Sequence, residues 1–199
     1  FTTTKLKEKT MTHELKEQVA AFKKAKENGL SCVMATLVAL DGSSYRPPGV
    51  SMLINEKGDM VGAVSGGCVE KEILKQSGSV FVDKIPKMMT YDGRYRLGCD
   101  GVLYILIEPF SPDEEFLNKF DDHLKRRKPI SLTTVFSRSV GSSDTYGTTI
   151  ELLGNKAKFF SGLKSVKNAD NEIFTRELKP SLRVAIIGDE HDAVILCAA

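Results

Sequence analysis

The chain has 199 residues, of which 41% are hydrophobic and 27% charged, and its formal net charge is +2 at pH 7. This is an ordinary composition for a globular protein, and the length suits one domain, or one domain with part of a second. A charge so close to neutral predicts no large basic face, so nucleic acid is not expected as a partner.

The four cysteines indicate the redox setting of the chain. Cys32, Cys68, Cys99 and Cys197 are too few for a disulfide framework and too widely spaced for a CxxC metal pair. They favour a reducing compartment, so we expect the protein in the cytoplasm. No apolar run has the length of a membrane span, and residues 1–18 lack the apolar core of a signal peptide, so no membrane partner is expected.

The first third of the chain combines one helix with β-structure. Apolar residues recur at helical spacing over residues 15–22 and predict an amphipathic helix that ends near residues 28–29, where glycine suits the left-handed cap. The apolar run 32–40 has the length of a strand. The Gly-, Ser- and Pro-rich stretch 41–49 predicts a loop, and residues 50–65 then read as a β-hairpin.

Two further helices and several strands are expected beyond this hairpin. The pattern predicts a short helix over residues 69–76 and an apolar strand over residues 102–110. Ser111, followed by Pro112 and a glutamate, predicts a capped helix start, and that helix must end before Pro129. After this proline the pattern returns to strands. The sequence therefore predicts an α+β domain, a mixed sheet with hairpins and flanking helices.

The segment SGGCVE, residues 65–70, sets one cysteine behind two glycines at the predicted start of a helix. Peptide N–H groups at a helix start carry partial positive charge, which lowers the pKa of a cysteine and favours the thiolate that attacks electrophiles and binds metals. Gly66 and Gly67 let another molecule approach the backbone closely. Glu70, in the first turn, works mildly against a thiolate on Cys68. The alternative is a buried cysteine behind a tight turn, and this stretch alone does not decide between the two.

Two other loops carry candidate residues. Cys99 lies between glycines in RLGCDG, and together with Cys68 it could hold a sulfur-ligated metal, pass a persulfide or form a redox pair. The alternative is a loop of turn residues without chemistry. Arg46 is followed by two prolines that stiffen its loop, and it stands beside Ser43 and Ser44. Such an arginine suits phosphate or oxoanion recognition, although a rigid turn with a solvated arginine gives the same pattern.

The last residues indicate the start of a second domain. The apolar stretch 184–187 followed by Gly188 is typical of the first strand and turn of a Rossmann-type unit. We therefore expect a first domain over residues 1–178, and the first strand and helix of a truncated Rossmann-like domain over residues 179–199. Glu190 stands where a bound pyrophosphate needs close approach to the backbone, which argues against NAD(P) binding.

Three segments together resemble the xanthine dehydrogenase accessory family (XdhC/CoxI-like proteins): GSSYRPPG at residues 42–49, GAVSGGCVE at residues 62–70, and LGCDGVLYILIEP at residues 97–109. Members of this family continue into a Rossmann-like domain that opens with a strand and G-x-G-H, of which this chain keeps Gly188 and His191. The resemblance implies a molybdenum-cofactor chaperone without turnover of its own. Such proteins bind the cofactor, protect it while its terminal sulfur is installed, and deliver it to a molybdenum hydroxylase.

The resemblance also implies partners and site residues. The expected partners are a xanthine dehydrogenase-like molybdenum hydroxylase, a cysteine desulfurase and a second copy of the chain. Cys68 and Cys99 are the expected metal contacts. Two other functions stay open, an NAD(P)-dependent oxidoreductase that uses the Rossmann-like domain and a thiol or persulfide carrier. The candidate cofactor-binding residues are Ser43, Ser44, Arg46, Gly66, Gly67, Cys68, Glu70, Cys99, Gly188 and His191.

Overall fold

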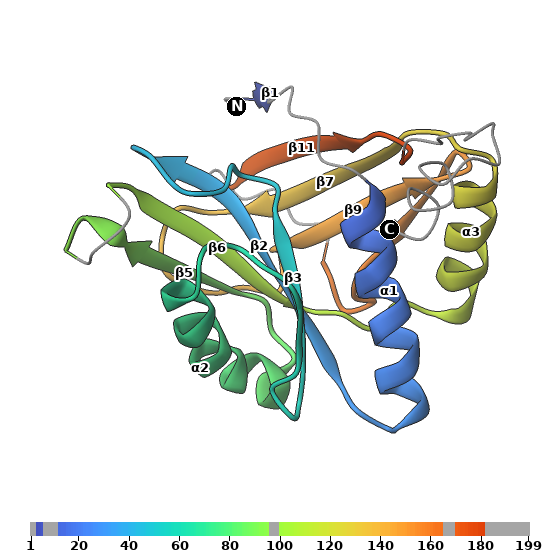
Figure 1. Cartoon of the computed structure of the whole chain (residues 1–199), viewed down its shortest axis with the longest axis horizontal. Helices are drawn as coiled ribbons and strands as arrows, with labels where there is room; N and C mark the ends of the chain where they lie inside the picture. The colour runs from blue at the N-terminus through green and yellow to red at the C-terminus, as the bar shows by residue number, and fades with distance from the viewer. Residues whose placement is uncertain (1–2, 6–11, 96–99, 165–169, 182–199) are drawn as a thin grey trace, which may run out of the picture.

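A computed structural model describes residues 3–5, 12–95, 100–164 and 170–181 (Figure 1). These residues form two β-sheets and three α-helices. The helices are α1 (Thr12–Glu27), α2 (Cys68–Asp83) and α3 (Glu114–Lys125), and one 3₁₀ turn, η1, covers Gly93–Tyr95. The first sheet has six strands in the order β4 (Met60–Gly62), β3 (Ser51–Asn55), β2 (Cys32–Asp41), β6 (Val102–Pro109), β5 (Lys87–Asp92) and β8 (Gly141–Ser142). The second has five strands in the order β1 (Thr3–Lys5), β11 (Glu172–Leu178), β7 (Ile130–Phe136), β9 (Gly147–Leu152) and β10 (Asn155–Lys158).

The predicted α+β arrangement of hairpins and flanking helices is confirmed for the described residues. The predicted hairpin is present, because Met52 of β3 pairs with Gly62 of β4 in antiparallel register. All neighbouring strands pair antiparallel except β1 and β11, which makes the second sheet mixed. The strands form two sheets, where the sequence predicted one. The predicted Rossmann-like strand and helix fall on residues 182–199, outside the described residues.

The strand β2 lies at the centre of the molecule and is covered on both faces, which explains its uninterrupted apolar sequence. Ala35 and Leu37 pack with Ile73 of α2 on one face of the sheet. Cys32 and Met34 face the other side, in a core shared with α1, α3 and the second sheet. In Figure 1 α2 accordingly lies on one side of the six-stranded sheet, and α1 and α3 lie away from α2.

Two helix boundaries differ from the expectation. The helix predicted over residues 69–76 continues to Asp83, because Val80 packs in the core beneath it and this tertiary contact outweighs the cost of Gly78. The predicted cap Ser111 is wrong for α3. Asp113 caps that helix instead, since its Oδ1 accepts a hydrogen bond from the N–H of Phe116 at 2.7 Å. The helix ends before the proline at position 129, as predicted.

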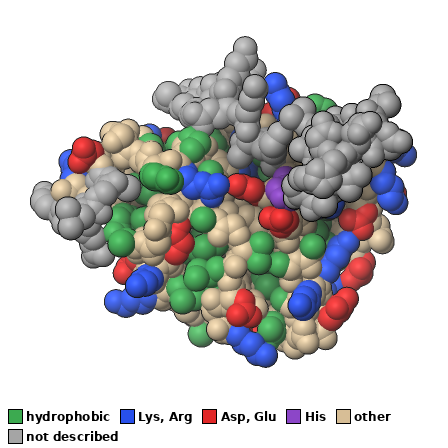
Figure 2. Space-filling model, viewed as in Figure 1, with side chains coloured by type: hydrophobic (Ala, Val, Ile, Leu, Met, Phe, Trp, Pro, Cys, Tyr) green, Lys and Arg blue, Asp and Glu red, His purple; other side chains and the backbone are tan. Residues whose placement is uncertain are grey.

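The described surface carries charges of both signs. Figure 2 shows acidic and basic side chains interspersed over the face in view, as the near-neutral net charge predicts. None of the helices in the described ranges is both long and apolar enough to cross a membrane.

Candidate functional site

Three loops that carry the sequence motifs leave the six-stranded sheet at the same end. Asp41, the last residue of β2, pairs with Val102, the first residue of β6, and Asp92 at the end of β5 pairs with the same residue. The hairpin partner β4 ends at Gly62, and the chain then leads directly to α2. The register therefore gathers the loops 42–50 and 63–67, and the described parts of the third loop, residues 93–95 and 100–101, around one end of the sheet.

The first and third loops touch through their backbones. A β-carbon on Gly42 would lie 2.6 Å from the carbonyl oxygen of Asp100, and one on Gly101 would collide with the carbonyl oxygens of Ser43 and Asp41. Only glycine allows this approach at both positions. Residues 100–101 of the third loop are thus held against the GSS segment, whereas Cys99 lies outside the described residues.

Arg46 joins the first loop to the second. Its Nη1 donates to the carbonyl oxygen of Ala63 at 2.6 Å, and its Nη2 donates to Oε1 of Glu14 in α1 at 2.9 Å. The Arg46 side chain is 31% exposed. Its remaining N–H groups have no acceptor within the described part of the chain. Arg46 therefore holds its own loop against the segment that precedes Cys68, and its remaining N–H groups are available to donate to a ligand.

Glu70 organises the backbone in front of α2. Its carboxylate accepts hydrogen bonds from the N–H groups of Val64 at 3.1 Å, Ser65 at 2.6 Å and Gly67 at 2.7 Å. Burial acts to raise the pKa of Glu70, but these N–H donors outweigh it and hold the pKa below the usual value. The carboxylate is therefore ionised, and the backbone N–H groups of the preceding loop stabilise its negative charge.

Cys68 is the first residue of α2 and is exposed to solvent. The alternative of a buried cysteine behind a tight turn is therefore wrong for this position. Among the described residues, nothing lies within 4 Å of a β-carbon placed on Gly66 or Gly67, so the described structure leaves space beside the backbone before the thiol. A ligand can approach both the sulfur and the two glycines. Cys32, in contrast, is buried.

Ser44 offers a second unsatisfied group in the first loop. Its Oγ is shielded from solvent, and no hydrogen-bond partner for it exists among the described residues. Buried hydroxyls normally have a partner, so an unpaired one near a candidate site points to a missing ligand atom or water. Ser43 and Tyr45 on either side are exposed, and Tyr45 is 82% exposed at the tip of the loop.

Two residues of α1 support these loops and were not singled out from the sequence. Glu14 holds Arg46, as described above. Gln18 is fully buried; its Nε2 donates to the carbonyl oxygen of Ser51 at 2.8 Å, and its Oε1 accepts from the Ser51 hydroxyl at 3.2 Å. The burial of Gln18 could have been predicted from the sequence, because this polar residue falls three residues after Leu15, on the apolar face of the predicted helix.

The carboxylate that ends the third motif, Glu108, lies away from the loops. It is buried between the two sheets and accepts hydrogen bonds from the N–H of Thr148 at 2.8 Å and from its hydroxyl at 2.5 Å. Burial raises the pKa of Glu108 to about 7, against the opposing effects of Thr148 and of the buried Arg176. Glu108 thus links the two sheets and does not line the site.

The remaining predicted site residues lie beyond the reach of the structure. Cys99, Gly188 and His191 fall outside the described residues, so the pairing of Cys68 with Cys99 stays a prediction. Within the described ranges, no group of three or more His, Cys, Asp or Glu side chains is arranged to hold a metal ion.

Comparisons with known proteins show which family part of this chain resembles. Residues 25–92, which carry β2, β3, β4, α2 and the first two loops, match the model of the XdhC and CoxI family. The resemblance inferred from the motifs is therefore confirmed: this stretch is similar to that family.

Two relatives and one solved structure resemble the chain. A probable xanthine dehydrogenase subunit of Bacillus subtilis (strain 168) is 30% identical over 96 residues, which cover 44% of this chain and 29% of the relative. The molybdenum cofactor insertion chaperone PaoD of Escherichia coli (strain K12) is 43% identical over 56 residues, 26% of this chain and 18% of the relative.

The solved structure supports the fold. It is the crystal structure of a xanthine dehydrogenase from Bacillus halodurans, which aligns with a TM-score of 0.59 at 24% identity and covers 82% of this chain and 53% of its own. The chain thus spans less than a third of the two curated relatives and about half of the structural neighbour.

Proposed function

We propose that this chain is the part of a molybdenum-cofactor accessory protein that receives the cofactor. In this proposal the complete protein protects the cofactor and delivers it to a molybdenum hydroxylase of the xanthine dehydrogenase type. The observation that carries the proposal is the exposed Cys68 at the open start of α2, with Arg46 hydrogen-bonded to the segment just before it. The family match and the name of the PaoD relative support the same assignment.

The groups around the site fit the chemistry of such a cofactor. Molybdopterin presents a phosphate, a dithiolene and an oxo-metal centre. A cysteine sulfur is a soft ligand that suits a transition metal or its sulfur, and Cys68 exposes one beside the two glycines. Arg46 and the unpaired Ser44 hydroxyl suit anionic oxygens. The cofactor would supply the redox chemistry of the client enzyme, and in this proposal the chain only carries the cofactor.

The residues of the chain have separate tasks in this proposal. Cys68 would contact the molybdenum or its sulfur, and Arg46, whose orientation is fixed by Glu14, would donate N–H groups to an anionic oxygen of the cofactor. Glu70 keeps the glycine segment open and in place and does not contact the ligand itself. We propose Cys99, Gly188 and His191 as further contacts, and a cysteine desulfurase and a second copy of the chain as further partners.

The test is retention of the cofactor by the complete protein, purified from a molybdenum-replete host. We expect molybdenum and pterin near one equivalent per chain in the parent protein, and loss of both in Cys68→Ala with an unchanged thermal midpoint. Cys32→Ala is the matched control, because it removes a buried thiol that lies on the other face of the sheet from α2 and Cys68. Equal retention in the two variants would contradict the proposal.

The exposure of Cys68 also favours a second candidate, a thiol or persulfide carrier. This protein would hold a sulfane sulfur on Cys68 without a bound cofactor. Intact-mass analysis distinguishes the two functions. An added sulfur on Cys68 in protein from a molybdenum-free host supports the carrier, and an unmodified thiol under those conditions rejects it.

A further inference from the structure

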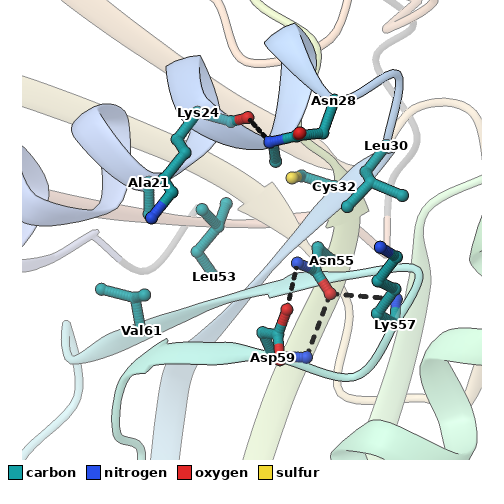
Figure 3. Close-up of a pocket in the computed structure, with 11 residues that line it drawn as sticks. Ala21, Lys24, Asn28, Leu30, Cys32, Leu53, Asn55, Lys57, Asp59 and Val61 are labelled. Carbon is teal, nitrogen blue, oxygen red and sulfur yellow. Dashed lines mark hydrogen bonds between the residues drawn. The ribbon is translucent and has the colours of Figure 1, made fainter.

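A groove separate from the Cys68 site lies between the C-terminal half of α1 and the hairpin of β3 and β4 (Figure 3). Its volume is about 500 Å³, within the range of sites that hold small organic ligands. It opens near the turn of the hairpin, residues 55–59, whereas the loops of the Cys68 site follow the other end of β4. The groove also faces the α1 side of the sheet, and α2 covers the opposite side.

The floor of the groove is apolar. It is formed by aliphatic side chains of α1, of the turn between α1 and β2, and of the hairpin, and by the Cys32 thiol of β2, which Figure 3 shows between the helix and the sheet. Burial raises the pKa of Cys32 to about 11, and the charge of Glu56 adds to this effect. The thiol is therefore neutral at physiological pH, so the floor suits an uncharged body and not covalent chemistry. The floor residues are Ala21, Ala25, Leu30, Cys32, Leu53 and Val61.

The rim of the groove is positively charged. Lys24 extends into it from α1, and Lys57 extends into it from the hairpin turn on the other side (Figure 3). Neither ammonium group has an acceptor among the described residues. Asp59 also lines the rim, but its Oδ2 accepts a hydrogen bond from Asn55 Nδ2 at 2.9 Å, and Asn55 Oδ1 accepts from the N–H groups of both Lys57 and Asp59. This network fixes the turn, and the residues that line the groove then include two cations without an acceptor and one carboxylate that is hydrogen-bonded.

We propose that this groove binds a small phosphate monoester with a compact apolar body. The body would pack on the aliphatic floor. The two lysines would hold the phosphate from opposite sides, because each ammonium group is a compact positive charge with three N–H donors. The combination of an uncharged floor with two unpaired cations distinguishes this ligand class from a neutral apolar ligand and from a free inorganic anion.

The test uses 1-naphthyl phosphate as the probe, with 1-naphthol and inorganic phosphate as the partial ligands, in titration calorimetry of the complete protein. We expect saturable binding of 1-naphthyl phosphate, and binding of each partial ligand weaker by about tenfold or more. Lys24→Ala and Lys57→Ala should each weaken the probe by about fivefold, and Ala21→Leu should fill the floor and abolish binding. Lys71→Ala, an exposed lysine of α2, is the matched control and should bind as the parent does.

Three results would overturn the proposal: no saturable binding, inorganic phosphate that binds as tightly as the probe, or full affinity in the two lysine variants. Exposed lysines tolerate truncation, so a thermal midpoint close to that of the parent protein is expected in both variants. Molybdenum retention should be unchanged in them. The outcome at this groove is therefore independent of the outcome at Cys68.

Discussion

Glu70 holds the backbone in front of Cys68, so its replacement by alanine is the sharpest perturbation of the site that leaves the thiol in place. The substitution removes the common acceptor of the N–H groups of Val64, Ser65 and Gly67. Val64 is fully buried and Ser65 is partly buried, so water replaces the lost carboxylate only in part. The segment 63–67 should then lose its fixed conformation.

The magnitude follows from the number of donors that are left unpaired. Each buried N–H that loses its acceptor costs about 1 kcal/mol or more, and the favourable interaction of a carboxylate with the start of a helix adds about 0.5 kcal/mol. We expect Glu70→Ala to lower the free energy of unfolding by about 3 kcal/mol. Glu70→Gln keeps one acceptor oxygen and should cost about half as much.

Urea denaturation followed by circular dichroism measures this change. The matched control is Glu72→Ala on the same helix, since Glu72 accepts only from the Gln76 side chain one turn away and should change stability by less than about 0.5 kcal/mol. The reasoning is refuted if Glu70→Ala is no more destabilising than Glu72→Ala. Cofactor retention should also fall in Glu70→Ala under conditions in which the protein remains folded.

The remaining predictions concern the elements that position the site. Burial raises the pKa of Glu108 to about 7, from an ordinary value of 4.5. Between pH 4.5 and pH 7 the folded protein therefore keeps a proton on Glu108 that the unfolded chain has released. Its stabilising contribution is therefore complete below pH 4.5 and is lost as the pH rises through 7, a decrease of about 3 kcal/mol that urea titrations at several pH values should detect in the parent and not in Glu108→Gln. Gly101→Ala should lower the free energy of unfolding by about 2 kcal/mol, and the thermal midpoint with it, because the new β-carbon meets the Ser43 carbonyl oxygen. Gly66→Ala is the control and should change stability little, because no described atom lies within 4 Å of its new β-carbon. Equal effects of the two substitutions would argue against the contact between the loops. Asp113→Ala should cost about 1 kcal/mol in urea denaturation by removing the cap of α3, and an unchanged midpoint would contradict that role.

Local patterns predicted most of the elements that frame the site. The helical spacing of apolar residues located α1, and the glycine after it adopts the expected left-handed conformation, with φ of 69° at Gly29. The alternation of apolar segments with turn residues located the hairpin of β3 and β4. These features depend on neighbours in the sequence, and the side chains there follow the same periodicity as the backbone.

The features that sequence patterns missed depend on contacts between distant segments. The division into two sheets is an example, because β8 leaves the strands around it and pairs with β5 of the other sheet. The partners of Arg46 lie 32 and 17 residues away, in α1 and before α2. The role of Glu70 was also missed. Its position near Cys68 suggested a charge that opposes a thiolate, whereas its carboxylate is bound by the backbone of the preceding loop.

The most direct test of the central claim is the rate at which Cys68 is alkylated by iodoacetamide, resolved by peptide mass spectrometry, in complete protein with and without bound molybdenum cofactor. If the sulfur of Cys68 contacts the cofactor, its modification should be slower by about tenfold or more in the loaded protein, while modification of Lys125, an exposed lysine at the end of α3, by an acylating reagent stays the same. Identical rates for Cys68 in the two states would contradict the account.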